Sequence, residues 1–235
     1  MKFDPETINT ADIQLADLSE SDLITAIHHI KNCKSQLLLK RCFDITVSSL
    51  LILLLSPLLI IVVIGVEISS QGPAFFVQQR LGYKQSLFNF LKFRSMYTNW
   101  AAQRPQDLAV NSAITGNLLK KVNDPRVTPL GRCLRQLSID ELPQLLNVLE
   151  GSMSLVGPRP LMIHMLEPYP NFSKVRHLVK PGITGLWQIR DRRHNNNACY
   201  MIEHDFEYVN QYSFWLDIKI LIKTIPAVLS MRGAF

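Results

Sequence analysis

The stretch Leu137–Gln144 has the sequence LSIDELPQ, and it places two adjacent carboxylates, Asp140 and Glu141, between apolar residues. Neighbouring carboxylates raise each other's pKa unless cations surround them, and Arg132 and Arg135 lie just upstream. A magnesium ion would relieve the repulsion and bring phosphate groups with it. The alternative interpretation is an acidic pair that is merely solvated on a helix. The nearby cations favour a site that handles phosphate.

A helical pattern of leucines runs from Leu130 to Leu149 and is interrupted by Pro143. It predicts a helix that begins near Ser138, with Ser138 as the N-cap, Glu141 as its capping-box partner and Asp140 in the first turn. The start of a helix also presents free N–H groups to a phosphate. The two carboxylates could therefore cap the helix, serve a site, or do both.

Two segments on either side supply further cations. Ala74–Val77 and Phe88–Arg94 are predicted to be short strands, and Lys92 and Arg94 would share one face of the second strand because side chains alternate. That pair suits either a phosphate or an exposed basic strand edge. Downstream, the stiff turn Val156–Pro160 fixes the direction of Arg159.

Charge is unevenly distributed along the 235 residues, whose net charge is +6. Residues 1–35 carry six acidic residues and three lysines, whereas the remainder carries 22 Lys and Arg against 13 Asp and Glu, a balance of +9. A basic body suits a polyanionic partner, such as nucleic acid, a phosphorylated substrate or an anionic membrane. The four cysteines show no CxxC spacing, which indicates reduced thiols and argues against a zinc site.

Ile45–Val66 is a run of 22 residues without a charge, long enough to cross a bilayer as a helix. Ser56 and Pro57 interrupt it near the middle, and Pro57 removes a helical N–H and clashes with the carbonyl of Leu53. Ser56 could hydrogen-bond a carbonyl that the kink exposes. The segment either spans with a kink or turns back. Basic residues flank it on both sides, which favours a re-entrant helix with both ends in the cytoplasm.

Other segments are less informative. Residues 1–36 form either a short amphipathic helix or a loosely ordered acidic arm. Residues 98–120 are a candidate mobile loop over a site. A helix is expected at about Leu161–Glu167. The tail Phe214–Ser230 is amphipathic, with Lys219 and Lys223 on its polar side, and would suit a membrane surface.

Taken together and in order, several motifs resemble the bacterial sugar transferases, the monotopic polyprenyl-phosphate phosphoglycosyl transferases. The resemblance covers roughly residues 38–235 and rests on Lys40–Asp44, Ser56-Pro57, Lys92–Met96, Asp140–Gln144 with Asn147–Leu149, Val156–Pro160, Pro181–Gly185 and Trp215–Lys219. It implies a mainly α fold with a small β-hairpin: a re-entrant membrane helix-break-helix, then a cytosolic α/β catalytic domain with interfacial amphipathic helices. The expected divisions are an acidic arm (1–36), the membrane helix (37–69) and the catalytic domain (70–235).

The resemblance also implies the reaction. A sugar 1-phosphate would pass from a UDP-sugar to polyprenyl (undecaprenyl) phosphate, with release of UMP, as the first membrane step of glycan or exopolysaccharide assembly. Asp140 would be the nucleophile and form a covalent phosphosugar-aspartate. Glu141, with Asp140, would hold Mg²⁺.

The same resemblance assigns further roles. The expected phosphate-binding residues are Lys92, Arg94, Arg135, Arg159 and Arg192, and Ser56-Pro57 would turn the membrane helix back. The protein would lie on the inner leaflet of the bacterial cytoplasmic membrane, with its catalytic domain facing the cytoplasm, and would bind no nucleic acid. The sugar and a homodimer are left open. The competing hypothesis is a non-catalytic, membrane-anchored basic binding protein, which would account for the charge and the anchor but not for the acidic pair.

Overall fold

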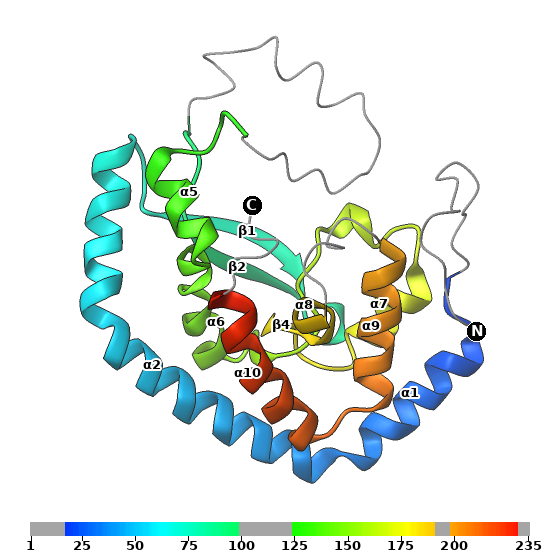
Figure 1. The fold of residues 1–235 in the computed structure, drawn as a ribbon. Helices are drawn as coiled ribbons and strands as arrows, with labels where there is room; N and C mark the ends of the chain where they lie inside the picture. The colour runs from blue at the N-terminus through cyan, green and yellow to red at the C-terminus, as the bar shows by residue number, and fades with distance from the viewer. Residues whose placement is uncertain (1–16, 99–123, 191–197, 230–235) are drawn as a thin grey trace.

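A computed structural model describes residues 17–98, 124–190 and 198–229. The architecture is mostly helical, with one antiparallel hairpin and a short parallel strand pair within these ranges (Figure 1). This confirms a mainly α fold with a small β-hairpin. The predicted mobile loop at 98–120 falls almost entirely outside the described residues.

Helix α2 (Lys34–Ser69) contains the whole charge-free segment and bends around one side of the body (Figure 1). Pro57 lies inside it, and the Ser56 hydroxyl donates to the Leu53 carbonyl at 2.8 Å. Proline has no N–H to donate. Pro57 therefore leaves the carbonyl four residues earlier, that of Leu53, without its helical partner. Ser56 therefore satisfies the carbonyl that Pro57 frees, as the sequence predicts.

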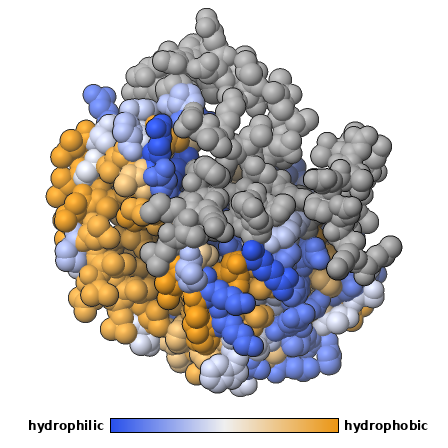
Figure 2. All heavy atoms as spheres, in the orientation of Figure 1, coloured by the Kyte–Doolittle hydropathy of each residue, from blue (hydrophilic) through white to orange (hydrophobic). Residues whose placement is uncertain are grey.

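Half of the 36 residues of α2 are exposed and only five are buried. Only 11% of its most apolar 18-residue stretch is buried, so it is not the core helix of a soluble protein. By length and composition it could cross a membrane. Apolar residues gather over the side of the molecule that α2 forms (Figure 2). An exposed apolar surface of this kind is typical of a region that contacts a membrane or another protein.

The hairpin joins β1 (Phe75–Leu81) to β2 (Leu87–Phe93) through the 3₁₀ turn η1 (Tyr83–Gln85). Both strands are present as predicted, and β1 continues four residues beyond Val77. The edge of β2 is fixed by Asn147, whose side chain accepts from the Leu91 N–H and donates to the Asn89 carbonyl. The hairpin is thereby attached to the helix that follows the acidic pair.

The segment around the acidic pair is not one helix. Helix α5 (Pro129–Gln136), the 3₁₀ turn η2 (Ile139–Glu141) and helix α6 (Gln144–Glu150) follow one another. The predicted capping box is wrong: Ser138 has a left-handed φ of 56° and no capping hydrogen bond. Pro143 is the N-cap of α6. The first turn of α6 therefore lies downstream of Asp140 and Glu141.

The second half continues with β3 (Ser154–Val156), η3 (Ile163–Met165), α7 (Pro170–Arg176), β4 (Gly182–Thr184), α8 (Leu186–Arg190), α9 (Ala198–Asn210) and α10 (Phe214–Leu229). The helix expected at Leu161–Glu167 is only the single turn η3. Pro160, Pro168 and Pro170 flank it, and residues before proline favour extended backbone.

The sequence left open whether the acidic arm forms a short helix or a loosely ordered segment. The structure shows that the end of the arm is a helix, α1 (Glu20–Asn32). Ser19 and Asp22 form its capping box, and Ala26 and Ile30 are buried where α1 packs against α7 and α9. The Asp17 carboxylate accepts from the N–H groups of Asn171 and Phe172, at the start of α7. Described residues of the arm therefore belong to the folded body.

A buried ionic network holds α2 and α10 together. Lys40 Nζ lies 2.6 Å from Asp217 Oδ2, both side chains being under 10% exposed, and the Tyr208 hydroxyl donates to Asp217 Oδ1 at 2.7 Å. Next to it, the Arg41 guanidinium donates to the carbonyls of Val148 and Leu149 at the end of α6. On the outer side of α10, Lys219 and Lys223 are exposed together with Trp215, Ile222 and Ile225, a mixture that suits a membrane interface.

We expect Lys40→Met to lower the free energy of unfolding by about 3 kcal/mol, because it leaves the buried Asp217 carboxylate without its cation. Equilibrium unfolding in detergent measures this. Lys219→Met, the same change on the exposed side of α10, is the control and should have little effect. Equal losses in the two variants would contradict the role given to the Lys40–Asp217 pair.

Candidate active site

The turn η2 holds the two carboxylates in different surroundings. It is fixed by α5 upstream, where Thr128 caps the helix by accepting from the Gly131 N–H at 2.8 Å. Gly131 is required there because an added Cβ would lie 2.1 Å from the Ser95 carbonyl oxygen. Helix α5 therefore packs directly on the chain that leaves β2, which brings η2 to the end of the hairpin.

Glu141 is clamped between two cations. Its Oε1 accepts from Lys92 Nζ at 2.8 Å and from Arg159, whose Nη1 also donates to Oε2 at 3.2 Å. Burial acts to raise the pKa of the Glu141 carboxyl, but the charges of Arg159 and Lys92 together outweigh it and hold that pKa well below its ordinary value. Glu141 is therefore a fixed anion that orders both cations.

Asp140 is buried but far less constrained. Lys92 Nζ lies 3.7 Å from Asp140 Oδ2, and no residue within 17–98, 124–190 or 198–229 donates a hydrogen bond to the carboxylate. Burial raises the pKa of Asp140, and the charge of Lys92 only partly offsets it. A desolvated carboxylate without donors is more nucleophilic than a hydrogen-bonded one.

The structure brings together four of the predicted residues with Arg135 beside them. The Arg135 Nε donates to the Ser95 hydroxyl at 2.8 Å, and its charge lowers the pKa of Asp140. The cluster of Lys92, Arg135, Asp140, Glu141 and Arg159 thus combines one fixed anion, one freer carboxylate and three cations. This arrangement can bind a diphosphate and direct an oxygen nucleophile at it.

Two predicted residues are not in this cluster. Arg94 is buried, and its Nη2 donates to the carbonyls of Val66 and Ser70 at 3.0 and 2.6 Å, at the end of α2. The structure therefore gives Arg94 a role in holding the end of α2, and its predicted phosphate contact gains no support from this placement. Arg192 lies outside the described residues.

Arg80 was missed, because the sequence places it in the approach to the turn. The structure extends β1 to Leu81, and Arg80 lies over the Phe90 ring, 5.5 Å from its centre, on the same face as Lys92. Burial and the neighbouring charge of Arg159 lower the pKa of Arg80 to about 10. If the predicted strand had been continued beyond Val77, the alternation of its side chains would have placed Arg80 on the same face as Gln78.

Arg176 was also missed. It is buried in α7, where its Nη2 donates to the backbone carbonyl of Arg159 and lies 3.0 Å from Asp205 Oδ2. Burial raises the pKa of Asp205 to about 6 despite the charge of Arg176. The Arg176–Asp205 pair thereby holds the turn that carries Arg159 in place. A single buried arginine leaves no sequence pattern.

The donor set can be compared with what a magnesium ion requires. Within the described ranges, no group of three or more His, Cys, Asp and Glu side chains could hold a metal ion by itself. Mg²⁺ commonly takes one or two carboxylates and completes its shell with substrate phosphates and water. Asp140 and Glu141 are adjacent and fit that pattern.

The sequence profile of the bacterial sugar transferases matches residues 35–231. This chain belongs to the bacterial sugar transferase family. The match includes all of α2 except Lys34, the hairpin, the cluster around Asp140 and the whole of α10, so this cluster lies within it.

Individual relatives support the same assignment. The galactosyl transferase CpsE of Streptococcus agalactiae is 42% identical over 200 residues, 85% of this sugar transferase and 44% of that protein. An undecaprenyl-phosphate glucose phosphotransferase of Komagataeibacter xylinus is 44% identical over 210 residues, 83% of this chain and 37% of that protein. The exopolysaccharide production protein ExoY of Rhizobium meliloti is 39% identical, covering 83% and 88%. The chain spans less than half the length of the first two and most of the third.

We expect the pKa of the Asp140 carboxyl to be raised above that of an ordinary aspartate, because the carboxyl is buried. Lys92→Met removes a charge that lowers this pKa, so the titration should move to higher pH. Glu141→Gln removes a charge that raises it, so the titration should move to lower pH.

Carbon-13 NMR of aspartate-labelled protein measures these shifts, with Asp140→Asn to assign the signal. If the two variants moved the titration in the same direction, the electrostatic account of the site would be wrong.

Proposed function

We propose that this chain transfers a sugar 1-phosphate from a UDP-sugar to polyprenyl (undecaprenyl) phosphate, releasing UMP and forming polyprenyl-diphospho-sugar. The observation that carries the proposal is the contrast within the acidic pair. Glu141 is locked by Lys92 and Arg159, whereas Asp140 is buried without a hydrogen-bond donor among the described residues. That contrast suits a nucleophile beside a fixed anion that organises phosphate-binding cations.

In the first step, an Asp140 carboxylate oxygen attacks the phosphorus that carries the sugar. A bond forms between that oxygen and phosphorus as the bond to the UMP oxygen breaks, and UMP leaves with the electron pair. Lys92 lies 3.7 Å from the attacking carboxylate and can hold an oxygen of the transferred phosphoryl group. Arg135 and Arg159 would neutralise the remaining charge of the diphosphate.

In the second step, an oxygen of polyprenyl phosphate attacks the same phosphorus. The phosphorus–Asp140 bond breaks, which returns the free carboxylate and gives the polyprenyl-diphospho-sugar. Burial serves this step because it excludes water, and water would otherwise hydrolyse the phosphosugar-aspartate. The covalent route replaces one direct transfer between two anionic substrates with two displacement steps. Each step takes place at a phosphorus whose surrounding charge is partly neutralised.

Asp140 and Glu141 would hold Mg²⁺ together with the donor's phosphates. When bound, the ion offsets the negative charge that hinders attack by a carboxylate. Glu141 suits this role because its pKa is held well below the ordinary value, so it is ionised at physiological pH.

The packing of α2 supports the proposed membrane placement. Its first half is tied to the body by Lys40 and Arg41, and its second half by Val62 and Val66, which pack with Phe93 and Leu134. Both halves return to the same body, which supports a re-entrant helix turned at Ser56 and Pro57. The catalytic domain would then lie on the cytoplasmic face of the bacterial inner membrane, where lipid phosphate is found.

The sugar stays open. One relative is named for galactose and another for glucose, so family membership does not select between them.

We expect Asp140→Asn to abolish UMP release from UDP-sugars in the presence of polyprenyl phosphate, with a loss of at least about a thousandfold. With sugar-phosphate-labelled donor and no lipid acceptor, wild-type protein should retain covalent label and the variant should not. Glu150→Gln, an exposed carboxylate at the end of α6, is the matched control and should retain activity.

Equal activity of Asp140→Asn and wild type would exclude the covalent aspartate. Absence of UMP release with every UDP-sugar, together with salt-sensitive binding of polyanions, would favour the binding-protein hypothesis.

We further expect chelation with EDTA to stop UMP release and Mg²⁺ to restore it, because the diphosphate charge would otherwise oppose attack. The measurement is a titration of initial rate against free Mg²⁺, with thermal unfolding to show that the fold is retained. Full activity in excess EDTA would exclude a role for the metal.

A further inference from the structure

The hairpin presents one face to the catalytic carboxylates. Lys92 and Arg80 both lie over the Phe90 ring, 5.4 and 5.5 Å from its centre, so these three side chains share that face. Lys92 in turn contacts Glu141. Phe75 and Phe93 stack on the other face, with ring centres 5.4 Å apart.

Phe76 belongs to the catalytic face. In the antiparallel register it is the direct partner of Lys92, and directly opposed residues project their side chains to the same side of a sheet. Phe76 is 48% exposed, an unusual position for an aromatic side chain next to a buried, charged site. No part of the proposed mechanism uses it.

Polarity changes along this face of β1. Phe76 is followed by Gln78 and then Arg80, whose register partners are Lys92, Phe90 and Phe88. At a rise of about 3.4 Å per residue, Phe76 and Arg80 are about 14 Å apart. Phe76 and Arg80 therefore lie at the two ends of this face, with Lys92 beside Phe76 and Phe88 beside Arg80.

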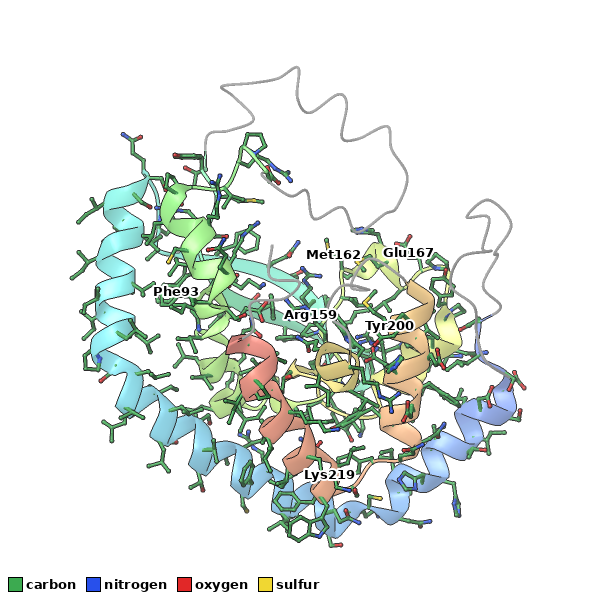
Figure 3. The ribbon with its side chains drawn as sticks, viewed as in Figure 1. Phe93, Arg159, Met162, Glu167, Tyr200 and Lys219 are labelled. Carbon is green, nitrogen blue, oxygen red and sulfur yellow. The ribbon has the colours of Figure 1, made fainter. Side chains whose placement is uncertain are left out.

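The two ends of the hairpin also have different neighbours. The Phe76 end is fixed to α2, because Phe93 packs with Val62 and Val66 and because Arg94 binds the last carbonyls of α2. At the other end, the Lys84 N–H donates to the His177 carbonyl after α7. In Figure 3, Phe93 lies on the α2 side of the body and Arg159 lies farther from α2.

We propose that Phe76 contacts the isoprenoid chain of the lipid acceptor, directly behind the phosphate that meets Lys92, while the donor's nucleotide lies toward Arg80. This rests on the proposed function. Polyprenyl phosphate is the occupant because it alone of the two substrates carries a long apolar chain, and that chain arrives from the bilayer. The last turns of α2 expose Ile61, Ile64 and Ile68, each more than half exposed, just before β1. β1 begins at Phe75, so the chain that leaves α2 enters the hairpin beside Phe76.

The test compares Phe76→Ser with Val77→Ser. Val77 is the neighbouring residue of β1, is 52% exposed and lies on the opposite face, so it controls for loss of an exposed apolar side chain from the same strand. We expect Phe76→Ser to raise KM for polyprenyl phosphate about tenfold and to leave KM for the UDP-sugar nearly unchanged. Val77→Ser should change neither.

A second measurement preserves an aromatic side chain and so does not depend on the serine variant folding. Benzoylphenylalanine at position 76 should photo-cross-link radiolabelled polyprenyl phosphate, and the same residue at position 77 should not. Equal KM values for the two serine variants in an active enzyme, or equal cross-linking at 76 and 77, would overturn the inference. Wild-type protein that releases no UMP would instead overturn the proposed function.

Discussion

The Glu141 carboxylate joins three segments that are distant in the chain: the hairpin through Lys92, the turn η2, and the turn that carries Arg159. Each cation would be costly to bury alone, and the Glu141 carboxylate offsets that cost for both. The same contact leaves Asp140 without a donor of its own. One ionic cluster thus determines both the shape of the site and the chemical difference between two neighbouring carboxylates.

Support for this cluster extends outward through buried polar groups. Arg176 holds the Arg159 carbonyl and is paired with Asp205, while Asn147 holds the edge of the strand that carries Lys92. These residues do not contact the carboxylates. They limit the movement of the groups that do, and a site for phosphoryl transfer depends on such fixed positions because most of its catalysis is placement and electrostatics.

The apolar helix α2 and the candidate site are mechanically connected. Phe93 and Arg94 follow Lys92 directly and bind α2, so the strand that carries Lys92 also anchors this apolar helix. At the other end of α2, Lys40 is buried against Asp217 of α10. The proposed function requires a lipid phosphate at the interface and a water-soluble nucleotide sugar to meet at one phosphorus, and this attachment would then set the height of Asp140 above the bilayer.

The sequence by itself determined the elements with strong local signals. A charge-free run broken by Ser56 and Pro57 requires a bent apolar helix, alternation predicts the two strands, and the acidic pair among basic residues marks the site. Only the tertiary structure decided which cation meets which carboxylate. The spacing suggested that Glu141 caps a helix from Ser138, whereas Lys92, 49 positions away, takes that carboxylate. Arg94 binds α2, and Arg80 and Arg176 lie near the site instead. Contacts of this kind depend on strand register and helix packing, which follow from the sum of many weak interactions and not from local pattern.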